Sequence, residues 1–114
     1  MSHPEFALQT NLLTHLRVCK RDRDPAVFYF HPFNKASGPR EGKMAKLMGV
    51  VAGVPDLIFF KNGVAWCLEI KALGGKLSPV QKETIARIRL SGIDVEIAYG
   101  LDEALYILKK RGVL

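Results

Sequence analysis

The sequence predicts a small α/β fold in which a mixed central β-sheet carries helices on its faces. A β-hairpin is expected at Asn62-Gly63, because Asn-Gly between two apolar runs is the strongest short-range signal for a two-residue hairpin turn. Segments with helical spacing of leucine and isoleucine lie before and after this hairpin, and one further strand separates the last two of them. This order of elements is typical of helices packed on the faces of a sheet.

The first helix is expected to begin at Pro4, because proline suits the first turn, where its missing N–H has no intrahelical partner to lose. Leu8, Leu12 and Leu16 follow at helical spacing and form an apolar stripe. Glu5 continues this stripe toward the start of the helix. From the residues alone, a favourable interaction with the helix dipole explains its carboxylate better than a metal-binding role does.

A short charged segment, KRDRDP at residues 20–25, follows the first helix. Its mixed signs favour a solvated turn over a binding site. The run AVFYFHPF after it is rich in β-forming aromatic residues and ends at Pro32, so a strand is expected there.

Residues 34–53 form the least regular part of the sequence and are rich in glycine and positive charge. Their position just before Asp56 favours contact with a phosphate backbone, although a solvated surface loop has the same composition. A short helix over residues 43–48 is expected inside the segment, with its apolar side chains packed. The expected packing residues are Met44, Leu47 and Met48, and the expected phosphate contacts are Lys35, Arg40, Lys43 and Lys46, joined by Lys76 from a later turn.

The hairpin brings two carboxylates and one ammonium group together. In the register that its turn sets, Asp56 lies opposite Glu69, and Lys71 points to the same side because side chains alternate along a strand. Directly opposed like charges destabilise a sheet, so a cation is expected between them. Magnesium fits, because it is usually held by one or two carboxylates and keeps water and phosphate as further ligands.

A metal at this position can activate water and stabilise charge that develops on a phosphodiester. Lys71 would then orient or deprotonate the water, or neutralise the phosphate. The alternative without chemistry is that Asp56 caps a turn after Pro55, while Glu69 and Lys71 form an ordinary ion pair at a strand end.

The next helix has a well-marked start at Ser78-Pro79-Val80-Gln81. Serine as the N-cap, proline at the first helical position and glutamine at the third form a capping box. Gln81 can also hold a scissile phosphate or a water molecule, because this helix begins close to the end of the strand that carries Lys71. The residues expected to face inward are Val80, Thr84, Ile85 and Ile88, and Gly92 is expected to end the helix.

A last strand over residues 93–99 alternates as a half-buried strand, and the helical crossover before it makes it parallel to the strand of Glu69. Glu96 is expected to be paired or to face solvent. Asp102 is expected to cap the last helix, whose basic end suits the helix dipole better than it suits a nucleic-acid motif. The expected inward residues are Ala104, Leu105 and Leu108, and the basic residues at the end are Lys109, Lys110 and Arg111.

The composition predicts one domain over residues 1–114 with a polyanionic partner. The net charge is +6 and the pI is near 9.6, which favours nucleic acid through long-range attraction and counterion release. Cys19 and Cys67 give no disulfide framework, and the histidines lack the spacing of a zinc site. With no signal peptide and no apolar segment long enough to span a bilayer, a cytoplasmic protein without a membrane partner is expected.

Pro55-Asp56, followed by a hairpin and Glu69-Ile70-Lys71, resembles the signature of the PD-(D/E)xK nucleases. The segments GVPDLIFF, LEIKALGGKLSPVQ and GIDVEIAYGLDEAL resemble one branch, the VRR-NUC or virus-type replication-repair nuclease domain, and the resemblance runs from about Glu5 to the C-terminus. It implies a restriction-endonuclease-like core with a metal site. The matching positions are Glu5, Asp56, Glu69, Lys71 and Gln81, and the backbone carbonyl of Ile70 would be a further metal ligand.

The resemblance implies a DNA endonuclease that depends on Mg²⁺ or Mn²⁺ and leaves a 5′-phosphate. Short members of this branch resemble viral or prophage proteins that act in a bacterial host as homodimers on branched DNA, including four-way (Holliday) junctions. A nuclease for flaps, nicks, plain duplex or RNA remains open, as do a nucleic-acid-binding module that has lost catalysis and a structural domain whose acids form only a turn and a salt bridge.

Overall fold

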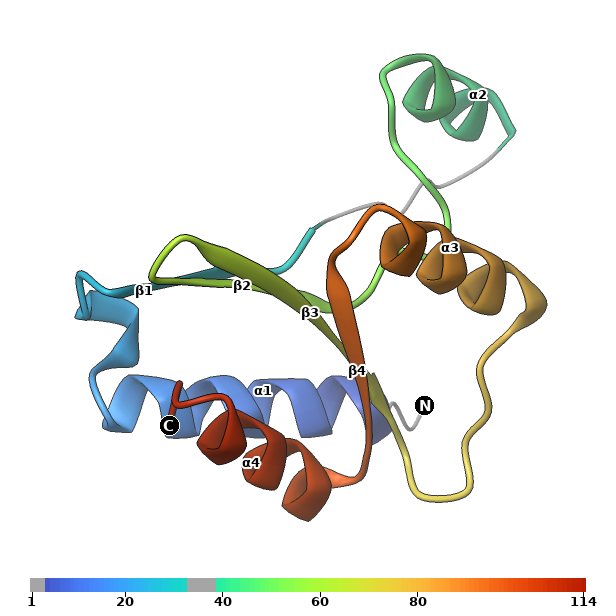
Figure 1. Cartoon of the computed structure of the whole chain (residues 1–114). Coiled ribbons are helices and arrows are strands. Elements are labelled where there is room, and N and C mark those ends of the chain that lie inside the picture. The colour runs from blue at the N-terminus through green and yellow to red at the C-terminus, as the bar shows by residue number, and fades with distance from the viewer. Residues whose placement is uncertain (1–3, 33–38) are drawn as a thin grey trace.

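The computed structural model describes residues 4–32 and 39–114, and it has a four-stranded sheet in the order β1-β2-β3-β4 (Figure 1). The first three strands are antiparallel neighbours and β4 is parallel to β3, so the predicted mixed sheet is confirmed. Two helices cover one face, and a third covers part of the other (Figure 1). The elements are α1 (Pro4–Val18), a 3-10 turn η1 (Arg21–Arg23), β1 (Val27–Phe30), α2 (Pro39–Leu47), β2 (Leu57–Lys61), β3 (Val64–Lys71), α3 (Pro79–Leu90), β4 (Asp94–Tyr99) and α4 (Leu101–Lys110).

The turn at Asn62-Gly63 sets the register of the central hairpin. Both residues have positive φ, 50° and 80°, as a type I′ turn requires. Lys61 pairs with Val64, and the ladder continues in the predicted register as far as Leu57. Asp56 therefore lies one position beyond the last paired residue of β2.

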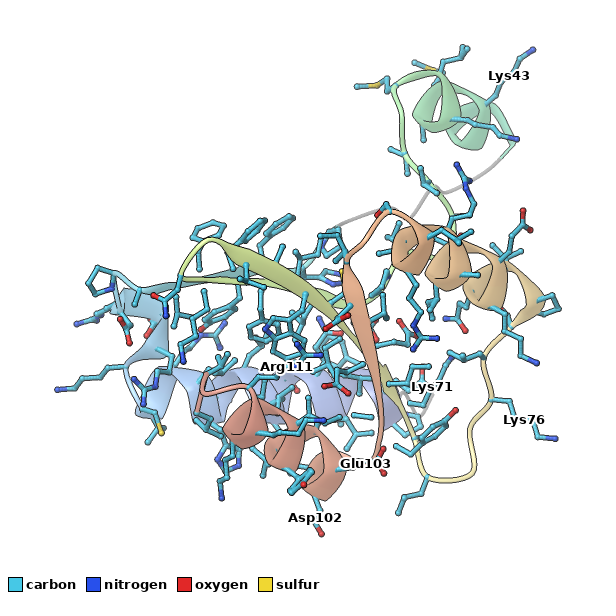
Figure 2. All side chains as sticks on the ribbon, viewed as in Figure 1. Lys43, Lys71, Lys76, Asp102, Glu103 and Arg111 are labelled. Carbon is cyan, nitrogen blue, oxygen red and sulfur yellow. The ribbon has the colours of Figure 1, made fainter. Side chains whose placement is uncertain are left out.

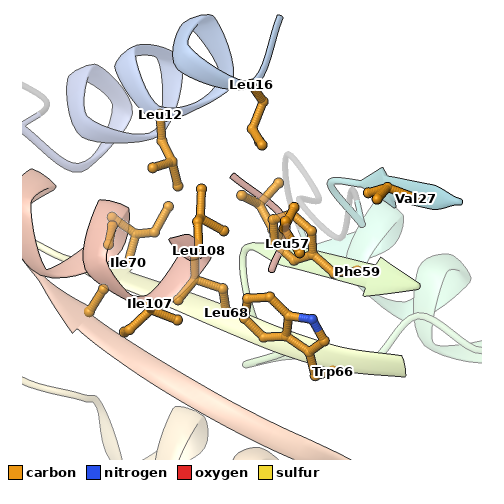
Figure 3. Close-up of a cluster of buried hydrophobic side chains, with 13 residues drawn as sticks. Leu12, Leu16, Val27, Leu57, Phe59, Trp66, Leu68, Ile70, Ile107 and Leu108 are labelled. Carbon is orange, nitrogen blue, oxygen red and sulfur yellow. The ribbon is translucent and has the colours of Figure 1, made fainter. Parts of the chain in front are cut away.

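The larger core lies between the sheet and the pair α1 and α4 (Figure 3). In its centre, the rings of Phe59 and Trp66 stack at 4.6 Å with an angle of 11° between them. The guanidinium of Arg111 lies 4.9 Å from the centre of the Trp66 ring and adds a cation–π contact that ties the end of α4 to the sheet. The other buried members include Leu12 and Leu16 of α1, Leu57, Leu68 and Ile70 of the strands, and Ile107 and Leu108 of α4.

A smaller core lies on the opposite, outer face of the sheet, where α3 covers β3 and β4 (Figure 1). Its buried members are Cys67, Ile85 and Val95. Cys67 is thus a buried free cysteine that packs as a small apolar side chain. None of the helices in the part of the chain described is long and apolar enough to cross a membrane.

Two expectations about packing were wrong. The short helix begins at Pro39 rather than residue 43, and it stands apart from the sheet, so its apolar side chains face solvent (Figure 1). Val80 is 49% exposed because it lies in the first turn of α3, beside the loop at Gly53, where the helix has not yet reached the second core. The exposed residues of the α2 region are Met44, Leu47 and Met48, at 55%, 82% and 83%.

The start of the last helix also differs from the expectation. Gly100, with a φ of 89°, is the N-cap residue, because only glycine adopts this conformation without strain at the sharp turn from β4. Asp102 is therefore not the cap and lies in the first turn, where its charge still suits the helix dipole.

Ion pairs account for the basic end of α4. Lys110 Nζ lies 3.0 Å and Arg111 Nε 2.9 Å from Glu96 Oε2, and Arg111 also reaches Asp94 at 3.3 Å. The basic residues thus fasten the helix end to β4, and Glu96 is paired, as expected.

Replacing Leu108 by alanine should lower the free energy of unfolding by about 2–5 kcal/mol, because Leu108 is fully buried and the change leaves a cavity. Leu90→Ala is the matched control, since Leu90 ends α3 with 88% exposure, and it should change stability by no more than about 0.5 kcal/mol. Urea denaturation followed by circular dichroism measures both values. Equal losses in the two variants would contradict the packing of α4 against the sheet.

Candidate active site

Two carboxyl groups meet at the end of the hairpin that is remote from its turn. Asp56 follows the fully buried Pro55 directly before β2, and Glu69 lies in β3 with only 2% exposure. Asp56 Oδ2 accepts a 2.7 Å hydrogen bond from the backbone N–H of Ile70. This bond holds the Asp56 carboxyl beside Glu69, as the hairpin register predicts.

A buried ammonium group lies next to these acids. Lys71 is 7% exposed, and its Nζ is 3.8 Å from Glu69 Oε2 and 3.9 Å from Glu5 Oε2 (Figure 2). Glu5 also accepts a 3.3 Å hydrogen bond from the backbone N–H of Ala72, so the start of α1 meets the end of β3. Neither ion pair is a short hydrogen bond, which leaves the ammonium group donors for another partner.

One amide joins the start of α3 to the acid pair. Gln81 Oε1 accepts from the backbone N–H of Ser78 at 2.9 Å, and the Ser78 hydroxyl accepts from the backbone N–H of Gln81 at 3.1 Å, which completes the predicted capping box. Gln81 Nε2 donates to Glu69 Oε2 at 3.1 Å. The side chain therefore has a structural role and a place in the site at once, because an amide offers both an acceptor and a donor.

Burial raises the pKa of both carboxyl groups, and for Glu69 the nearby charge of Asp56 adds to this effect. For Glu69, burial and then the charge of Asp56 raise the pKa to about 8, against the opposing effect of Lys71. Burial also raises the pKa of Asp56, and the N–H of Ile70 counteracts part of that rise. Because the pKa of Glu69 is raised to about 8, this carboxyl group holds a proton at neutral pH when no other cation is present.

The residues present fit a divalent cation. Within residues 4–32 and 39–114, Glu69 Oε1 is buried and accepts no hydrogen bond, so one carboxylate oxygen is left for a ligand. In the positions that they occupy in these ranges, no three His, Cys, Asp or Glu side chains converge closely enough to hold a metal ion. The candidate side-chain ligands are therefore Asp56 and Glu69, a donor set of two carboxylates that suits magnesium or manganese with water and phosphate as further ligands.

Residues 33–102 match the family model of the VRR-NUC domain. The chain belongs to the VRR-NUC family. The match includes the hairpin, both carboxylates, Lys71 and Gln81, while Glu5 precedes it. The family is one of nucleases of the PD-(D/E)xK type, which generally depend on divalent metal ions and act on DNA.

Two solved structures share the fold of this VRR-NUC chain. One, titled "VRR_NUC domain protein", has a TM-score of 0.66 at 23% identity, and the match covers 96% of this chain and 88% of the chain in that structure. The other, titled "VRR_NUC domain", has a TM-score of 0.60 at 17% identity, and the match covers 95% of this chain and 97% of the chain in that structure. No curated protein matches the chain.

The structure places His31 beside Asp56 in this VRR-NUC chain, whereas the sequence indicated for it only an approach to DNA from the end of the strand, on proximity alone. His31 directly follows β1, and its Nδ1 lies 2.6 Å from the backbone carbonyl of Asp56. Because a carbonyl only accepts, Nδ1 carries the proton and Nε2 is the nitrogen left for a ligand. Phe30 of β1 pairs with Ile58 of β2, and this pairing places the next residue, His31, beside Asp56. No short turn joins the two strands, so the sequence did not predict the pairing.

The predicted phosphate-binding cations do not gather around the carboxylates. Lys43 and Lys46 are exposed on α2, and Lys76 is exposed on the loop between β3 and α3. In Figure 2, Lys43 and Lys76 both point away from Lys71. Lys35 and the side chain of Arg40 lie outside the described residues.

The proton on Glu69 links the stability of the metal-free protein to pH. The folded chain holds this proton up to about pH 8, whereas the unfolded chain releases it near the ordinary pKa of 4.5. The unfolded chain thus binds fewer protons in this window, so the free energy of unfolding falls as the pH rises through it. Glu69→Gln should remove this fall and be more stable than wild type above pH 8 by about 1–3 kcal/mol.

Thermal unfolding with a chelator present, below pH 4.5 and above pH 8, measures this difference. Glu103→Gln on the exposed side of α4 controls for the loss of one carboxylate. A Glu69→Gln variant that is less stable than wild type above pH 8 would show that the buried acid is stabilised as the anion.

Proposed function

We propose that this protein is a DNA endonuclease that uses Mg²⁺ or Mn²⁺ bound at Asp56 and Glu69. The observation that carries the proposal is the buried Glu69 Oε1, which lacks a hydrogen bond within the described residues although it stands beside a second carboxyl group. A bound divalent cation would supply the missing positive charge, and such ions activate water and stabilise charge on a phosphodiester. Membership of a nuclease family supports this use of the site.

The side chains around the acid pair have separate proposed roles. Asp56 and Glu69 would bind the metal, with the backbone carbonyl of Ile70, the residue after Glu69, as a further ligand. Lys71 would orient the attacking water or neutralise the phosphate through its ammonium, which makes only long ion pairs, or deprotonate the water in its neutral amine form. Gln81 holds Glu69 in place through its 3.1 Å hydrogen bond.

Glu5 is proposed as an additional metal ligand from α1. Its carboxylate lies 3.9 Å from Lys71 Nζ and accepts from the N–H of Ala72, so it already stands beside the site. Its side chain keeps 46% of its surface exposed and can turn toward a cation. In the metal-free protein the same carboxylate holds the ammonium of Lys71 near Glu69.

Basic residues outside the metal site are proposed to bind the phosphate backbone. The net charge of +6 supports this, because neutralised phosphates release counterions and so favour association. Because α2 lies apart from the sheet, its basic side chains would contact DNA at a distance from the carboxylates (Figure 1). The residues proposed are Lys35, Arg40, Lys43, Lys46 and Lys76.

The proposed substrate is branched DNA, in particular the four-way junction, and the proposed active form is a homodimer. Two symmetric cuts need two active sites related by a two-fold axis, and a chain with one site supplies them by pairing with a second copy. The protein would act in the cytoplasm of a bacterial cell, encoded by a phage or prophage.

Asp56→Ala should abolish the binding of Mn²⁺, because it removes one of the two carboxylates at the site. Isothermal titration of Mn²⁺ into wild type and variant measures this. Asp102→Ala is the matched control, since Asp102 is an exposed acid in the first turn of α4. Equal Mn²⁺ affinity in wild type and Asp56→Ala would remove the metal site from the proposal.

Lys71→Ala should lower the rate of DNA cleavage by about 100-fold or more, as expected for loss of a group that serves the attacking water. The assay uses labelled four-way junction, flap and linear duplex with Mg²⁺ or Mn²⁺, and Lys82→Ala on the exposed side of α3 is the control. Symmetric junction cuts by wild type support the resolvase. Cleavage of the flap or the duplex alone would support the nuclease activity and contradict the four-way junction as substrate. Metal-independent DNA binding without cleavage would indicate a nucleic-acid-binding module.

A further inference from the structure

Three phenylalanine side chains form an exposed cluster on the outer face of the sheet, at the edge made by β1 and β2. Phe28 is 63% exposed, and Phe30 and Phe60 are each 41% exposed. Their ring centres lie 6.1 to 6.4 Å apart, and the rings of Phe30 and Phe60 are within 8° of parallel. We call these three residues the phenylalanine platform.

Packing of the fold does not explain the platform. The core on the other face has its own aromatic contact in Phe59 and Trp66, and the core under α3 on the outer face includes Ile58 of β2 but none of the three phenylalanines. Among the elements that the structure describes, none covers the part of this face that carries Phe28, Phe30 and Phe60 (Figure 1). Outward positions of a half-covered antiparallel sheet are normally polar, and contiguous exposed apolar side chains mark binding surfaces.

The platform shares its sheet face with the candidate metal site. Side chains alternate along a strand, so Phe60, Ile58 and Asp56 point to one side, as do Cys67, Glu69 and Lys71 of the paired strand. On β1, the position after Phe30 is His31, whose Nδ1 donates to the Asp56 carbonyl. A molecule lying along this face would therefore contact the rings and reach the carboxylates without crossing to another layer.

A hollow of about 290 Å³ lies at the far end of the platform, between Phe28 and Phe60. The hairpin turn and the residues before β1 form its other walls. Asn62 offers an amide with both donors and acceptors at the edge of this space, and Asn62 itself is exposed. The other residues around the hollow are Pro25, Ala26, Val27, Lys61 and Gly63.

We propose that the phenylalanine platform binds unpaired nucleotides of a DNA substrate by stacking their bases on its rings. This rests on the proposed nuclease function and adds a substrate class beside the fully paired four-way junction, namely branched DNA with a single-stranded segment next to the scissile phosphate. Aromatic side chains bind any base through its π-face, and only unpaired bases have that face free. The chain's charge of +6 favours a polyanion over an apolar protein partner, and Phe60 of the platform lies on the same side of β2 as Ile58 and Asp56.

The test separates aromatic stacking from apolar contact. A double variant, Phe28→Leu with Phe60→Leu, keeps an apolar surface and removes both rings, while Phe28→Tyr with Phe60→Tyr keeps both rings. Tyr106→Ala is the control for loss of an exposed aromatic ring, because Tyr106 lies on α4, across the sheet, and is 65% exposed. Fluorescence anisotropy with a chelator present measures affinity for a duplex with an unpaired thymine tail and for the fully paired duplex.

The leucine variant should bind the tailed duplex about 5-fold or more weakly and the paired duplex as wild type does, while the tyrosine variant and Tyr106→Ala keep wild-type affinity for both. Unchanged binding of the tailed duplex, or an equal loss on both substrates, would overturn the proposal. So would conversion of a dimer to a monomer with unchanged DNA affinity, which would assign the platform to a second copy of the chain.

Cross-linking supplies a direct readout of stacking. A tail that carries 5-iodouracil should attach to Phe28, Phe30 or Phe60 under ultraviolet light, and attachment confined to other residues would count against the platform. These measurements need neither metal nor cleavage. If wild type binds the tailed duplex but no metal-dependent cleavage occurs, only the proposed nuclease function is rejected. If wild type cleaves DNA and the leucine variant binds the tailed duplex as wild type does, only the proposed role of the phenylalanine platform is rejected.

Discussion

The register of the β2–β3 hairpin is the constraint on which the rest of the molecule depends. Side chains alternate with a period of two, so a slip of one residue would turn Glu69 and Lys71 toward α1 and α4 and bring Ile70 to the outer face. The left-handed conformations of Asn62 and Gly63 prevent this, because they fit a two-residue loop. A turn at one end of the hairpin thus determines the chemistry at its other end.

The two faces of the sheet divide stability and function between them. The inner face, with α1 and α4, holds most of the buried apolar side chains, whereas the outer face combines a small core under α3 with the acid pair. Burying Glu69 beside Asp56 works against the fold, as its raised pKa shows. The inner core and the ion pairs at the end of α4 provide the stability that tolerates such a site.

Features set by local sequence could be predicted, and those set by distant contacts could not. The hairpin and the capping box at Ser78 depend on neighbouring residues, so the sequence was sufficient for both. Glu5 reaches Ala72 across most of the chain, and only the resemblance to a family indicated it. Periodicity tells which residues share a face but not what covers that face, so Leu47 and Val80 were wrongly expected to be buried.

The single tryptophan of the chain gives a spectroscopic view of one layer only. Trp66 lies stacked on Phe59 beneath the guanidinium of Arg111, on the side of the sheet opposite Glu69. Its emission therefore reports on the docking of α4 and the integrity of the inner core, while a ligand on the outer face does not touch it. Folding and ligand binding can accordingly be followed as separate signals in one sample of the unlabelled protein.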